Sequence, residues 1–189
     1  SPHGPEISTN RNYPFAIFQY APQEEFEMRR RIGMLVDELR ALGWQVRDID
    51  LLKVLFEYLE AEEGGDLIAG WIEEEKLQYT AHGNNYGPPL DFLKQALDGV
   101  MKDETALPQR VRDNITALAG SGPAERTVVF LSRIGALYPV FKTSTLLRYL
   151  DKGVRVPTIA LYPGTREEDH YLSFMGEIPA DRDYRPRIY

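Results

Sequence analysis

Four short apolar runs, separated by segments with helical spacing, constrain most strongly how this chain can fold. The runs are "YPFAIFQY" at 13–20, "WQVRDID" at 44–50, "TVVFLS" at 127–132 and "VPTIALYPG" at 156–164. Each has the length and composition of a buried strand, and strands that alternate with helices indicate a mostly parallel sheet. We therefore predict an α/β fold, a three-layer sandwich whose short, mostly parallel central sheet is flanked by helices.

The segments between these runs carry helical patterns. The first, at 24–42, places apolar residues on one predicted face and is followed by Gly43, a residue typical of helix ends. A second helix is predicted from 51, ending at Gly64 and Gly65, and the middle of the chain is predicted to be helical. Pro163 and Gly164 are expected to stop the last strand. The predicted apolar face of the first helix consists of Met28, Ile32, Leu35, Val36, Leu39 and Leu42.

Length and composition limit the class of protein. The 189 residues suit one domain with a sizeable core, and no apolar run approaches the ~20 residues of a membrane helix. We expect residues 1–12 to be a leader that is disordered or foreign to the native protein, and 13–189 to form a single domain. The absence of cysteine excludes disulfides and thiolate metal sites, and fits a cytoplasmic protein. The net charge of −7 disfavours DNA binding by this domain alone.

Ligands of open α/β sheets bind beyond the carboxyl ends of the strands, where this chain offers polar residues. Neither a G-x-x-x-x-G-K-[ST] nor a G-x-G-x-x-G motif occurs, so the phosphate cradle of common nucleotide-binding folds is absent. Asp48 and Asp50 could ligate a metal. Asp50 directly precedes the second helix, however, and we favour its interpretation as a helix N-cap. The residues at these strand ends are Tyr20, Asp48, Asp50, Ser132, Arg133 and Tyr162.

Other candidate catalytic residues lack the spacing that chemistry requires. The histidines His3, His82 and His170 stand in no H-x-x-x-H or H-E-x-x-H pattern. The serines lack a G-x-S-x-G elbow. The basic turn 29–31 is either a contact for a partner or a solvated helix face. These residues predict no catalytic residue, no metal site and no cofactor.

A long connection follows the third run, between Arg133 and a helix predicted to begin near Thr143. Most strand–helix connections need only two to six residues, so the extra length suggests a role beyond joining two elements. Arg and Tyr are enriched among the residues that dominate binding energy at interfaces. Packing over the sheet edge is an equally good explanation for the aromatic residues here. The candidate partner-binding residues are Arg133, Tyr138, Phe141, Lys142 and Arg148.

An "E-x-x-x-R" helix follows the first predicted strand, and a later "YP-F…LL…L" segment is followed by a strand closing on "PG". In these motifs the chain resembles the BrxB family of BREX (bacteriophage exclusion) defence systems. Arg133–Ile134 differs from the family, which tends to have a glycine-containing turn there. The matching positions of the later segment are Phe130, Leu131, Ser132, Gly135, Tyr138, Pro139, Phe141, Lys142, Thr143, Leu146, Leu147, Leu150, Pro163 and Gly164.

The resemblance implies a non-enzymatic adaptor that helps to assemble an anti-phage defence complex. It implies a PglZ-type protein of the alkaline-phosphatase superfamily and other BREX components as partners, without a membrane. One alternative is a nucleotide-binding or ATPase-like α/β domain with a degenerate site near Tyr20, Asp50, Arg133 and Tyr162. Another is a subunit that contacts DNA through the basic turn 29–31 and the tail arginines Arg182, Arg185 and Arg187.

Overall fold

The structure, a computed structural model, describes residues 14–61, 65–103, 106–119, 126–137, 143–151, 153–167, 171–174 and 187–189. The predicted leader 1–12 lies outside these residues. The strands are β1 (Phe15–Tyr20), β2 (Gln45–Asp50), β3 (Thr127–Ser132), β4 (Thr158–Glu167), β5 (Tyr171–Phe174) and β6 (Arg187–Ile188). The α-helices are α1 (Glu25–Ala41), α2 (Leu51–Ala61), α3 (Asp66–Ala81), α4 (Gly87–Lys102), α5 (Leu107–Ala119) and α6 (Thr143–Asp151), with short 3₁₀ turns η1 (Pro22–Glu24) and η4 (Ile134–Leu137).

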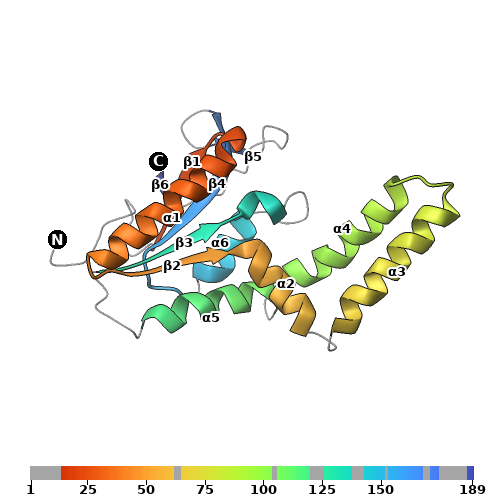
Figure 1. Cartoon of the computed structure of the whole chain (residues 1–189), viewed down its shortest axis with the longest axis horizontal. Helices are drawn as coiled ribbons and strands as arrows, with labels where there is room; N and C mark the ends of the chain where they lie inside the picture. The colour runs from red at the N-terminus through yellow and green to blue at the C-terminus, as the bar shows by residue number, and fades with distance from the viewer. Residues whose placement is uncertain are drawn as a thin grey trace.

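The central sheet has the order β2-β3-β4-β1-β6, and all neighbouring strands along this path are parallel. β5 pairs antiparallel with the outer end of β4. The connection from β1 through α1 to β2 passes over β4 and β3, as Figure 1 shows. The four strands predicted from the apolar runs are therefore confirmed as the centre of a mostly parallel sheet.

Helices cover both faces of the sheet, which confirms the predicted three-layer sandwich. Side chains alternate between the two faces along a strand. On β3, Val129 and Leu131 join the larger core cluster with α2, α5 and α6, whereas Val128 and Phe130 join a smaller cluster with α1. The predicted helix after residue 143 is confirmed as α6, and its leucines belong to the larger cluster: Leu146, Leu147 and Leu150.

The last strand continues further than its proline and glycine predict. β4 runs through Pro163 and Gly164 to Glu167, because the segment from Gly164 onwards gains β5 as a neighbour. The described pairing with β3 ends at Ala160, so Pro163 lies beyond it and is paired with Tyr20 of β1 alone. Proline has no N–H to donate to a neighbouring strand, and it is tolerated there because only one neighbouring strand is paired at this position.

The first helix buries a narrower face than its sequence predicts. Ile32 and Val36 are buried against the sheet, while Leu35 is 39% exposed and Leu42 is more exposed still. The end of the helix follows the prediction. Gly43 adopts a φ of +80°, a conformation that glycine accepts easily, and its N–H donates to the Arg40 carbonyl at 2.9 Å.

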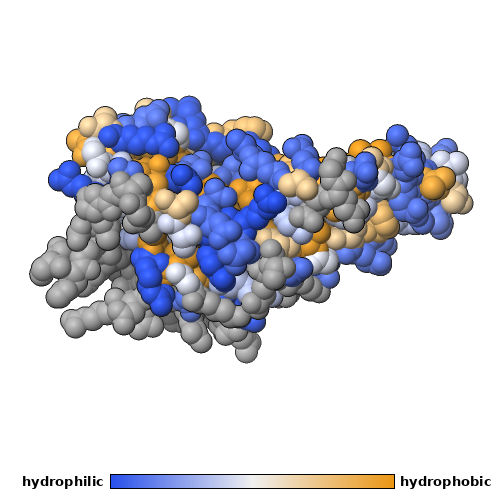
Figure 2. Space-filling model, turned by 90° about the horizontal axis from the view of Figure 1, so that it is seen from below, coloured by the Kyte–Doolittle hydropathy of each residue, from blue (hydrophilic) through white to orange (hydrophobic). Residues whose placement is uncertain are grey.

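Helices α3 and α4 lie side by side and project away from the sheet as a helical arm, seen at the right of Figure 1. Leu67, Ile68 and Trp71 at its base pack against the core, but no residue of α3 is fully buried. Figure 2 shows hydrophobic and hydrophilic surface mixed along this arm. Its exposed large apolar residues are Ile72, Leu77, Tyr86 and Leu90. Among the described residues, no helix has both the length and the apolar character needed to span a membrane.

Candidate functional site

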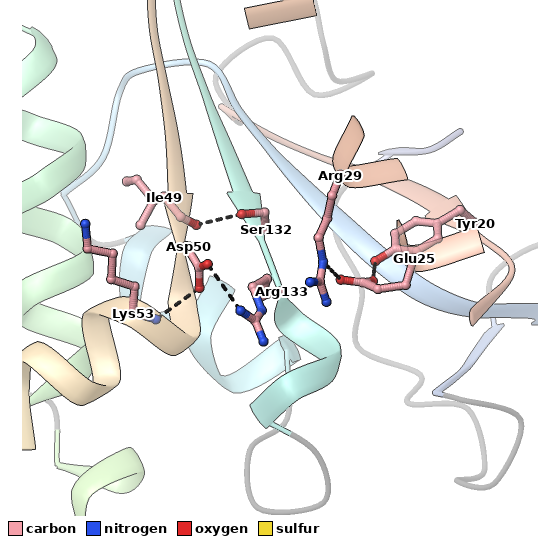
Figure 3. A network of polar contacts seen from close by, with 8 residues as sticks. All are labelled: Tyr20, Glu25, Arg29, Ile49, Asp50, Lys53, Ser132 and Arg133. Atoms are coloured by element: carbon pink, nitrogen blue, oxygen red, sulfur yellow. Dashed lines mark hydrogen bonds and ion pairs between the residues drawn. The ribbon is translucent and has the colours of Figure 1, made fainter. Parts of the chain in front are cut away.

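The carboxyl ends of β1, β2 and β3 meet at one edge of the sheet, where they form a polar cluster (Figure 3). Asp50, at the end of β2, is its centre. Its Oδ1 accepts a hydrogen bond from the Lys53 N–H at 3.0 Å, and its Oδ2 lies 3.7 Å from Nη1 of Arg133. The first contact confirms the predicted N-cap of α2. The second joins the ends of two neighbouring strands.

Arg133 turns the chain out of β3 with a φ of +58°, in the left-handed region where a glycine would be less strained. The turn leads directly into η4, whose Ile134 and Leu137 are buried. The Arg133 side chain is 30% exposed and packs against Asp50. Burial of Ile134 and Leu137 explains why the chain turns here although the residue is not glycine.

Asp48 and Ser132 lie beside this pair on the same edge. The Ser132 hydroxyl donates to the Ile49 carbonyl at 3.5 Å and so bridges β3 to β2. Although Asp48 is exposed as a whole residue, partial desolvation raises the pKa of its carboxyl, the neighbouring Ser132 hydroxyl lowers it in part, and the nearby Asp50 raises it further. Asp48 therefore binds its proton more tightly than an ordinary aspartate.

A second group of side chains occupies the end of β1. The Tyr20 hydroxyl donates a hydrogen bond to the Glu25 carboxylate, and Nε of Arg29 donates to the other oxygen of that carboxylate at 2.8 Å. Burial raises the pKa of Tyr20 well above its usual range, and the bonded Glu25 adds to the shift. The phenol therefore remains a hydrogen-bond donor at physiological pH.

Two ion pairs match charges at this edge within the chain. Asp50 faces Arg133, and Glu25 faces Arg29. Among the residues that the structure describes, no group of three or more His, Asp or Glu side chains could hold a metal ion. One group ties the end of β2 to the end of β3, and the other ties the end of β1 to the first turn of α1.

The predicted partner-binding residues are described only in part. Arg148 is exposed on α6, and Arg133 takes part in the cluster above. Tyr138, Phe141 and Lys142 lie outside the described residues. Tyr162, predicted at a strand end, is 2% exposed and belongs to the core, so it offers no accessible group.

Other predicted candidates take ordinary roles. Within the basic turn, Arg29 pairs with Glu25, while Arg30 and Arg31 both pair with Glu27, at 2.7 Å each. Hydrogen bonds from both arginines lower the pKa of Glu27 to about 2. His82 is exposed at the tip of the helical arm, with Nδ1 2.8 Å from the Gln78 carbonyl. His3, His170, Arg182 and Arg185 fall outside the described residues, as does the side chain of Arg187.

An apolar groove of about 550 Å³, absent from our predictions, lies between α1 and the sheet. Its walls include Met28 and Leu35 of α1, together with Phe18 of β1 and Ile159 of β4. The available signal was the width of the apolar pattern on α1.

Fold and site together define a three-layer α/β domain whose strand-end polar groups are paired internally. The sequence profile of the family described as BREX protein BrxB matches residues 47–188. The chain therefore belongs to the BrxB family of BREX proteins. A BREX protein BrxB from Bacillus cereus (strain H3081.97) is 26% identical over 173 residues, covering 90% of this chain and 80% of that protein. No solved structure matches the chain significantly.

Proposed function

We propose that this protein is a non-enzymatic adaptor that binds a PglZ-type partner and helps to assemble a BREX anti-phage defence complex. Membership of the BrxB family carries the proposal. An assembly role needs accessible surface rather than a catalytic centre.

We propose the segment from Arg133 to Lys142, together with Arg148, as one contact for this partner. Arg148 is the most suitable residue to substitute in a test, because it is exposed on α6 while the opposite side of this helix is buried. Tyr138, Phe141 and Lys142 enter the proposal from the sequence alone. A basic and aromatic set of this kind suits a partner surface that carries acidic groups.

Co-purification from cells carrying the complete BREX operon tests the adaptor role. We expect the tagged protein to retain the PglZ-type component, and Arg148→Glu to weaken that retention at least about tenfold. Lys76→Glu, at an exposed position of α3, serves as the charge-matched control. Arg133→Glu is a poor choice, because it would place a carboxylate against Asp50. A wild-type protein that retains no component contradicts the proposal.

A nucleotide-binding domain with a degenerate site is the second candidate. The observation that favours it is the position of Arg29 and Arg133 near the carboxyl ends of parallel strands, where ligands of open α/β sheets bind. Thermal-shift measurements with nucleotides, with and without Mg²⁺, decide this point. A ligand at 100 times its dissociation constant stabilises the native state by about 2.7 kcal/mol. An unchanged melting temperature at millimolar nucleotide would reject this candidate.

A further inference from the structure

The apolar groove beside α1 leaves part of a sheet face open to solvent. Phe18 points into the groove and is 41% exposed, although its strand β1 has neighbours on both sides, β4 and β6. Strands in the middle of a parallel sheet normally have both faces covered by helices. On this face, among the described helices, α1 alone packs against the sheet.

The groove wall formed by α1 has the spacing of a helix–helix contact. Met28, Ile32, Leu35 and Leu39 line the groove and follow one another at intervals of four, three and four residues. This alternation produces the apolar seam along which two helices pack. Ile32 is buried against the sheet, whereas Leu35 is 39% exposed and available to a second helix.

Basic side chains stand at or beside both ends of the groove, in contrast to the net charge of −7 of the whole chain. Arg31 lines one end, where it and Arg30 share the single carboxylate of Glu27, so this end keeps a positive charge. At the other end, exposed Arg126 directly precedes the lining residue Thr127, and its Nη1 lies 3.5 Å from the Leu42 carbonyl. Exposed Arg155 stands two residues before the lining residue Pro157.

We propose that this groove binds an amphipathic helix of a partner protein whose apolar face is flanked by acidic residues. The helix would lie beside α1, cover Phe18 and Leu35, and complete the helical layer on this face of the sheet. Its acidic residues would meet Arg31 at one end and Arg126 at the other. The proposal rests on the adaptor role and names a second contact surface, separate from the strand-end segment and Arg148.

The test uses the full chain and a set of overlapping peptides that together cover the sequences of the other proteins of its operon. Each peptide has about 20 residues, because isolated helices shorter than ~12–15 residues are only marginally stable. Binding is measured by fluorescence anisotropy. We expect wild-type protein to bind a peptide that is amphipathic when helical and carries acidic flanks, with an affinity that falls as salt rises. Leu35→Asp should weaken this binding at least about tenfold.

Met34→Asp is the matched control, because Met34 stands next to Leu35 on α1 and is 51% exposed but does not line the groove. It should change the affinity less than about twofold. The double variant Arg31→Gln with Arg126→Gln removes both charges without setting a carboxylate against Glu27, and it gives a second, surface-only variant should Leu35→Asp fail to fold. We expect it to weaken binding of the acidic peptide and to leave the circular dichroism spectrum unchanged.

Four results would overturn the groove proposal. In the peptide assay, these results are the absence of any bound helical peptide and equal binding by Leu35→Asp and Met34→Asp. The other two are a lipid found in the groove by native mass spectrometry and a wild-type dimer that Leu35→Asp converts to monomer. Whole-component co-purification reads out the adaptor role separately. If the whole component is retained but no helical peptide binds the groove, the groove proposal fails and the adaptor role stands. If peptides bind but no whole component is retained, the adaptor role fails instead.

Discussion

The Arg133 guanidinium lies 3.7 Å from the Asp50 carboxylate, so the residue that follows β3 is tied to the residue that ends β2. The other oxygen of this carboxylate accepts the Lys53 N–H at the start of α2. Asp50 thus stabilises a helix end and a strand end at once. Its two roles can be separated, because a neutral amide can cap a helix but cannot form an ion pair.

We expect Asp50→Ala to lower the free energy of unfolding by about 1 kcal/mol, the usual value of a lost N-cap. Asp50→Asn should cost less than about 0.5 kcal/mol, because asparagine caps well and the ion pair is about one-third exposed and screened by solvent. Urea denaturation of the two variants measures the difference. An asparagine variant as unstable as the alanine variant would mean that the ion pair, and not the cap, dominates.

The positive φ of Arg133 predicts an unusual order of stability at this position. Arg133→Gly should be more stable than Arg133→Ala by about 1 kcal/mol, since both lose the ion pair but only glycine adopts this conformation without strain. Arg148 provides the control, because it lies inside helix α6. There the order should reverse, with alanine more stable than glycine by about 1 kcal/mol. The same order at both positions would contradict the left-handed turn.

The raised pKa of Asp48 gives a pH dependence with a definite sign. Below the ordinary aspartate pKa of ~3.9 the carboxyl is protonated in both folded and unfolded states and costs nothing. As pH rises from there through the folded-state pKa, the unfolded state loses its proton first and becomes relatively more favourable. Asp48→Asn cannot titrate, so its stability relative to wild type should increase between pH 3 and pH 7. Urea titrations across this range would show a constant difference if Asp48 were unperturbed.

Two leucines in helices should differ sharply in their contribution to stability. Leu150 on α6 is fully buried in the larger core cluster, whereas Leu77 on α3 is 64% exposed on the helical arm. Leu150→Ala should lower the free energy of unfolding by about 2–5 kcal/mol through lost burial and a cavity. Leu77→Ala should change it by no more than about 0.5 kcal/mol. A large effect of Leu77→Ala on stability would indicate that this side chain packs against another part of the protein and is not exposed.

Sequence periodicity predicts the centre of this fold well, because strands and helices that are buried in the core need apolar residues at regular spacing. The run 127–132 is apolar, every residue of β3 is buried, and Asp50 caps the helix that its position predicts. The periodic pattern on α1 is less informative. It identifies apolar positions but cannot say which of them meet the sheet, so Leu35 and Val36 look equivalent in sequence and differ in exposure.

The candidate site is harder to predict because its contacts join residues far apart in the chain. No local pattern pairs Arg133 with Asp50, and nothing in the sequence around Phe18 reveals that its side of the sheet is left open. The short C-terminal strand was missed for a different reason. Two residues, Arg187 and Ile188, are too few to show any periodicity, and they become a strand because β1 has an open edge beside them.

That short strand is expected to matter more than its length suggests. Gln19 N–H donates to the Tyr189 carbonyl at 3.1 Å, Tyr189 N–H donates to the Ile17 carbonyl at 2.9 Å, and Ile188 packs against the larger core cluster. Deleting 187–189 should lower the free energy of unfolding by about 2 kcal/mol, since two net hydrogen bonds of about 1 kcal/mol each are lost. It should also expose β1 as a new sheet edge, which favours association. Tyr189→Ala is the control, because it keeps both backbone hydrogen bonds. Urea denaturation and sedimentation velocity compare the two, and equal stability together with equal monomer content would show that β6 is dispensable.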